Sequence, residues 1–230
     1  MSRMTWIGML AVAWMLAGAA RSAVAAEPPA KSDDATARHS FKDVERWAKE
    51  FEAPDRKDWQ QPVIVLRVLG VDEGESVADL GAGTGYFTHI LSIAVGAAGR
   101  VWAVDVEPAM LDYIAKRTDL GPGKVTTVLA TPDDPKLPAG EVDLVLAVDT
   151  WHHIDDRLAY LKRLAGVLSP NGRVAIVDWH EGELPLGPPA GHKLSREAVL
   201  DEFARAGWRL ESESVALPYQ YLLVFYPPGT

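Results

Sequence analysis

The chain has no cysteine among its 230 residues, and this absence removes several kinds of chemistry. Disulfides, thiol nucleophiles, iron–sulfur ligation and cysteine-based zinc sites all need that side chain. The apolar segment near the N-terminus is not followed by a cysteine either, which excludes the lipid anchor of a lipoprotein.

Basic residues are in short supply. Lys and Arg number 23 against 32 Asp and Glu, for a formal net charge of -9. A chain with this balance repels phosphate backbones, so we expect no nucleic-acid partner. We expect a small-molecule acceptor as the partner. The sequence does not indicate the oligomeric state.

Long hydrophobic runs are limited to one, Trp6–Ala20, whose 15 residues are few for a membrane span. Arg3 precedes the run and the small residues of "AVAAE" follow it, which is typical of a signal peptide over residues 1–26. We therefore expect an exported, periplasmic protein without an integral membrane domain after cleavage. An uncleaved signal that tethers the protein to the membrane is the alternative. The polar stretch 27–40 reads as a disordered linker.

The remainder, residues 41–230, alternates strand and helix patterns. Continuous apolar strands separated by helices indicate a parallel sheet covered on both faces. The last two strands have no helix between them, so the final one should run antiparallel. The prediction is a doubly wound α/β fold with a seven-stranded, mostly parallel sheet. The predicted strands are 76–80, 100–105, 124–130, 142–148, 173–179, 208–217 and 219–226, and the predicted helices are 41–51, 60–70, 87–95, 108–117, 156–168 and 195–206.

A glycine turn follows the first predicted strand in "VADLGAGTGYFTHIL", Val77–Leu91. It lacks the Gly-Lys-Ser/Thr of a phosphate-binding loop. Its spacing is G-x-G-x-G, whereas the dinucleotide fingerprint is G-x-G-x-x-G. Asp79 just before the turn would repel a pyrophosphate but suits a ligand that carries an ammonium group.

This stretch resembles the first motif of class I methyltransferases that use S-adenosylmethionine. The likeness spans about residues 41–226 and includes "DDPKLP", "WHHIDD" and "LPYQY". It is closest to small-molecule methyltransferases of bacteria, including exported ones. It implies a Rossmann-like methyltransferase fold with an N-terminal helical lid and S-adenosylmethionine as cofactor.

Cofactor-binding residues follow from these motifs. Asp105 ends the second strand about 20 residues after the turn, where a carboxylate accepts ribose hydroxyls; capping the next helix is its alternative role. The resemblance implies that Asp133 contacts the adenine amino group and that the N–H of Asp134 contacts a ring nitrogen, although a solvated acidic turn is the other reading. The predicted donor-site set is Asp79, Gly81, Gly83, Gly85, Asp105, Asp133, Asp134 and Asp149.

Candidate catalytic residues lie after the fourth strand and after the turn. His152 or His153 could remove a proton from the acceptor, because imidazole titrates near neutral pH. Either could instead cap or pack the following turn. Tyr86 reaches the methyl-transfer zone or packs beneath its helix, and Arg56 either binds an acceptor anion or forms a salt bridge. No metal site is expected.

These residues predict an S-adenosylmethionine-dependent methyltransferase acting on a small molecule that the sequence does not identify. A non-catalytic protein that only binds the donor is the first alternative. An NAD-dependent oxidoreductase is the second, and the glycine spacing argues against it.

Overall fold

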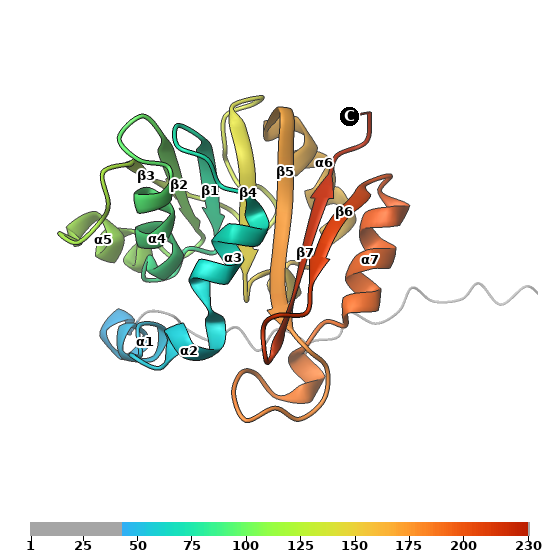
Figure 1. The fold of residues 1–230 in the computed structure, drawn as a ribbon, viewed down its shortest axis with the longest axis horizontal. Helices are drawn as coiled ribbons and strands as arrows, with labels where there is room; N and C mark the ends of the chain where they lie inside the picture. The colour runs from blue at the N-terminus through green and yellow to red at the C-terminus, as the bar shows by residue number, and fades with distance from the viewer. Residues whose placement is uncertain (1–42, 230) are drawn as a thin grey trace, which may run out of the picture. The chain divides into compact units, whose positions relative to one another are not determined.

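A computed structural model describes residues 43–229; the predicted signal peptide and linker lie outside these residues. The described part contains a seven-stranded sheet in the order β3-β2-β1-β4-β5-β7-β6 (Figure 1). The predicted fold class is confirmed. The strands are β1 Ser76–Leu80, β2 Arg100–Asp105, β3 Lys124–Leu129, β4 Val142–Val148, β5 Leu168–Trp179, β6 Arg209–Ser214 and β7 Gln220–Tyr226.

Strand directions follow from the connections. The β1–β2, β2–β3, β1–β4 and β4–β5 pairs are parallel, and β7 is antiparallel to both β5 and β6. A parallel pair needs a crossover, which helices supply, whereas a short turn suffices between β6 and β7. All parallel strands therefore end at one edge of the sheet, and β1 and β4 lie side by side there.

Helices cover both faces of this sheet, and two apolar clusters hold them in place. One cluster joins the sheet to α6 and α7, with Leu161 and Phe203 fully buried. The other joins it to α3 and α4, with Val65 and Leu91 fully buried. The helices are α1 Val44–Phe51, α2 Arg56–Gln60, α3 Pro62–Leu69, α4 Tyr86–Ala94, α5 Pro108–Lys116, α6 Arg157–Val167 and α7 Arg196–Arg205.

Two details differ from the sequence-based expectation. The sequence predicts a helix to residue 168 and a strand from residue 173, yet β5 already begins at Leu168, where the backbone pairs with Val142 of β4. Helix α2 was not predicted, because five largely polar residues carry no helical periodicity.

The carboxyl edge of the parallel strands is covered by α1, α2 and the segment 180–194 (Figure 1). Glu52 at the end of α1 pairs with Arg117 at 2.6 Å, and the Phe51 ring lies 3.5 Å from where a Cβ on Gly83 would be. We call α1 and α2 the lid. Within the described residues, none of the helices has the length and apolarity required to span a bilayer.

Candidate active site

The glycine turn joins β1 to α4 in a conformation that requires glycine. Gly81 and Gly85 have φ angles of 75° and 88°, in the left-handed region that side chains disfavour. A Cβ on Gly81 would lie 2.2 Å from the Thr150 hydroxyl, and one on Gly85 would lie 3.0 Å from Ile114. Gly81 thus brings the turn against the loop that follows β4, and Gly85 brings it against α5.

Asp105 ties this turn to β2. Its carboxylate accepts hydrogen bonds from the N–H of Gly83 at 2.8 Å and from the N–H of Glu107 at 2.9 Å. Burial raises the pKa of Asp105, although these backbone donors oppose the shift. Each carboxylate oxygen keeps a lone pair, so the predicted contact to ribose hydroxyls remains open to it.

Asp79 lies beneath the turn and is 3% exposed. Its carboxylate accepts a hydrogen bond from the Thr88 hydroxyl at 2.6 Å. Burial, helped by the nearby charge of Asp105, raises its pKa to about 6. In the turn itself, the buried hydroxyl oxygen of Thr84 has no partner among the described residues. Two carboxylates and an unpaired hydroxyl fit a hydrogen-bonding, cationic ligand better than a pyrophosphate.

The predicted adenine contacts form a small hairpin after β3. Asp133 accepts from the Thr131 hydroxyl at 2.7 Å, and its side chain is 75% exposed. The N–H of Asp134 donates to the Thr131 carbonyl at 3.1 Å. Both assignments to adenine stay predictions. To contact an adenine ring nitrogen, the N–H of Asp134 would have to leave the Thr131 carbonyl.

Asp149 directly follows β4 with a φ of 53°, which is rare outside glycine. Its carboxylate accepts from the amide of Gln220, the first residue of β7. Burial raises its pKa to about 7 and the charge of Asp178 adds to this, while Arg56 at 4.0 Å opposes it. This constrained carboxylate stands at the switch point of the sheet, where open α/β folds bind ligands.

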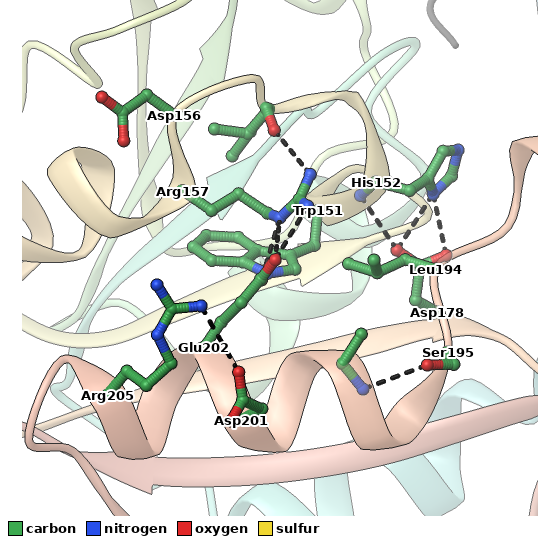
Figure 2. A network of polar contacts seen from close by, with 12 residues as sticks. Trp151, His152, Asp156, Arg157, Asp178, Leu194, Ser195, Asp201, Glu202 and Arg205 are labelled. Carbon is green, nitrogen blue, oxygen red and sulfur yellow. Dashed lines mark hydrogen bonds and ion pairs between the residues drawn. The ribbon is translucent and has the colours of Figure 1, made fainter. Parts of the chain in front are cut away.

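His152 forms the best-defined polar pair at this edge. Its Nδ1 lies 2.8 and 2.9 Å from the two carboxylate oxygens of Asp178, a fully buried residue of β5 (Figure 2). Burial alone lowers the pKa of His152, but the hydrogen bond and charge of Asp178 outweigh it and raise the pKa. Within residues 43–229 the ring bonds through Nδ1, which leaves Nε2 to meet a ligand.

The other predicted catalytic residues are placed differently. His153 is exposed, and its ring centroid lies 4.1 Å from that of His152. The ring of Tyr86 lies beneath the guanidinium of Arg56, 4.2 Å away. Of the three, His152 has the geometry of a base oriented by a carboxylate; all three roles stay predictions.

A second network holds the short helical turn that carries His152. Trp151 is fully buried, and its indole N–H donates to Glu202 of α7 at 3.4 Å. Glu202 also accepts from Arg157 at 2.8 Å (Figure 2). Because α7 and α6 both anchor this turn, the backbone of His152 is fixed from two sides.

Sequence reasoning missed Asp178, Gln60 and Gln220. Asp178 stands in "RVAIVDW", where it reads as a break in an apolar strand. Gln220 stands in "LPYQY", one of the stretches that carry the resemblance, but no role was predicted for it. The glutamines are fully buried and bonded to each other, although 160 positions separate them. The described residues contain no cluster of three or more His, Asp or Glu side chains suited to a metal ion.

Known proteins share the family motifs and the fold of this chain. A methyltransferase domain family model matches residues 78–176. The crystal structure of a SAM-dependent methyltransferase from Aquifex aeolicus is 30% identical, with a TM-score of 0.74, covering 80% of this chain and 97% of that one. Aklanonic acid methyltransferase DauC of Streptomyces sp. strain C5 is 29% identical over 64% of this chain and 69% of its own length. An uncharacterized methyltransferase of Mycobacterium tuberculosis is 34% identical, but the match spans only 48% of its length.

The fold and the glycine turn, with these matches, define the class of protein. The chain belongs to the class I S-adenosylmethionine-dependent methyltransferases. Its cofactor is S-adenosylmethionine.

Proposed function

We propose that the protein transfers a methyl group to a small molecule whose accepting atom carries an ionisable proton. S-adenosylmethionine, when bound, supplies a methyl group on a cationic sulfur. The Asp79 and Asp105 carboxylates, with the glycine turn, would hold that ligand. Relatives that act on small molecules, among them a 2-methyl-6-phytyl-1,4-hydroquinone methyltransferase, support the acceptor class.

The observation that carries this proposal is the His152–Asp178 pair. The carboxylate of Asp178 holds the proton on Nδ1 of His152, so Nε2 is the basic nitrogen. Thr150, two residues earlier, touches Gly81 of the glycine turn, which brings this base beside the donor site. In the proposed reaction Nε2 takes the proton of the accepting atom as that atom attacks the methyl carbon.

Donor binding tests the first half of the proposal. We expect calorimetry to detect binding of S-adenosylmethionine and of its demethylated product, but not of NAD, because Asp79 would repel a pyrophosphate and the glycine spacing is G-x-G-x-G. Asp105→Ala removes a charged acceptor of hydrogen bonds, each contributing about 1.5–3 kcal/mol. The variant should therefore bind the donor at least about tenfold more weakly.

The matched control is Asp112→Ala, at an exposed position of α5, which should bind normally. Absence of heat with both adenosyl ligands would contradict the proposal. Donor binding without turnover on any small molecule would favour the non-catalytic alternative.

We also propose that the protein is exported, on the basis of Arg3, the apolar run 6–20 and the small residues before Glu27. Cell fractionation and N-terminal sequencing test this. A cytosolic protein that retains Met1 would contradict it.

A further inference from the structure

Arg56 is the guanidinium through which the lid meets the carboxyl edge of the sheet, and groups of the chain surround it. Nη1 donates to the Phe51 carbonyl at 2.6 Å, and Nε donates to the side-chain oxygen of Gln60 at 3.0 Å. Nη2 faces the Asp149 carboxylate at 4.0 Å, and the Tyr86 ring covers one face. The side chain is 12% exposed. Two of its five N–H groups are hydrogen-bonded, and its charge already faces a carboxylate.

Arg56 is also part of a closed ring of side chains. Gln60 donates to the amide oxygen of Gln220, and Gln220 donates to Asp149, which faces Arg56. The ring joins α2 to β7 and to the loop after β4. Such a network is stable when every member is satisfied and costly when one contact is lost. We call these four side chains the latch; an anion that entered here would have to break it.

The charge at this edge also disfavours an anion. Among the described residues, carboxyl groups outnumber cations at this edge: Asp79, Asp105, Asp149 and Asp178 lie there with Arg56 and His152, although burial raises the pKa of Asp149 to about 7 and that of Asp79 to about 6. The next two guanidinium groups are paired elsewhere. Arg157 bonds Glu202, and Arg117 bonds Glu52 and Asp119. The excess of carboxyl groups would repel an anionic acceptor that came to this edge of the sheet.

Two indole rings pack together at the same edge of the sheet, and that of Trp179 is buried. The Trp59 ring of α2 and the Trp179 ring of β5 have centroids 5.2 Å apart. Gly187, in the segment 180–194, packs so closely on Trp179 that a Cβ there would lie 2.6 Å from the ring. Trp179 directly follows Asp178 at the carboxyl end of β5, so both residues lie at the same edge of the sheet, although adjacent strand side chains point to opposite faces.

We propose that the acceptor is an uncharged aromatic molecule with a weakly acidic hydroxyl, such as a phenol, and not a carboxylate; this rests on the function proposed above. The paired base has a role only if the acceptor arrives with its proton, and a carboxylate at neutral pH has none to give. In the step, the hydroxyl oxygen forms the bond to the methyl carbon while its proton goes to Nε2 of His152. The carbon–sulfur bond breaks, and sulfur keeps the electron pair. Arg56 holds the lid and is not a receptor for the acceptor.

A matched pair of probes tests the inference: 1-naphthol and 1-naphthoate, which differ in charge and share their rings. Calorimetry first establishes that the protein binds S-adenosylhomocysteine, and each probe is then titrated into that complex. We expect naphthol to bind at least about tenfold more tightly than naphthoate. We also expect Arg56→Gln, checked by thermal unfolding, to leave the weak naphthoate binding no weaker.

Tighter binding of naphthoate, and its loss in Arg56→Gln, would make Arg56 an anion receptor and overturn the inference. Binding of neither probe to a complex that does hold S-adenosylhomocysteine would also overturn it. If S-adenosylhomocysteine itself does not bind, it is the proposed function that fails, so the two failures are distinguishable.

Discussion

Asp178 shows how one buried carboxylate defines the chemistry of a neighbouring imidazole. Asp178→Asn keeps the shape of the side chain but removes the charge that raises the pKa of His152. We expect the His152 pKa to fall in this variant. An NMR titration of the imidazole signals measures it, with His153→Gln to assign them.

The same pair links stability to pH. Because the folded-state pKa of His152 is raised, the folded protein binds the proton more tightly than the unfolded chain. The stability from this proton is fully present below the unfolded pKa of about 6.5 and is lost as pH rises through the folded pKa. Asp178→Asn should flatten that dependence in chemical denaturation at a series of pH values. An unchanged pH profile and an unchanged imidazole titration would contradict the pairing.

At the scale of elements, the lid depends on polar contacts with the sheet. Gln220→Leu removes the partner of Gln60 and of Asp149. A buried amide left unsatisfied costs about 1–3 kcal/mol, so the lid should open more often. We expect hydrogen exchange in α2 to speed up roughly tenfold, with α4 unchanged. Lys57→Gln, at an exposed position of the same helix, is the control; equal exchange in both variants would show that the latch does not hold the lid.

The sequence predicted the elements whose signals are local. Continuous apolar runs predict β4 and β7. The predicted helices 60–70 and 195–206 correspond to α3 and α7, because Pro62 and Gly70 flank the first and Ser195 caps the second. The partners of the site residues could not be read in this way. His152 meets Asp178 from 26 positions away, and Asp149 meets Gln220 from 71 positions away. A glutamine in a strand gives no sign of its partner until the register of β5 and β7 is known.

At the scale of the whole molecule, Arg173 fastens the C-terminal end of α3 to the sheet. It lies in β5, is 9% exposed, and donates to the carbonyls of Leu69 at 2.9 Å and Gly70 at 3.1 Å. It also pairs with Glu75 at 2.9 Å. Arg173→Met leaves that carboxylate and the end of α3 unpaired, and breaking such a buried pair costs about 3–5 kcal/mol.

Urea denaturation should show this loss in the free energy of unfolding. Arg100→Met is the comparison, because its pair with Glu141 is at 4.0 Å with side chains 37% and 59% exposed. Exposed pairs contribute about 0–1 kcal/mol. Equal losses in the two variants would mean that Arg173 has no special part in holding α3 to the sheet.

The contact between Gln60 and Gln220 has a consequence for the order of folding. It closes a loop of 160 positions, so its entropy cost is among the largest in the chain. β7 is the last strand in the sequence, and Gln60 of α2 has no glutamine to meet until that strand is in place. The parallel strands can pair earlier, because their contacts are closer in sequence. The glycine turn can therefore form before the Gln60–Gln220 contact does.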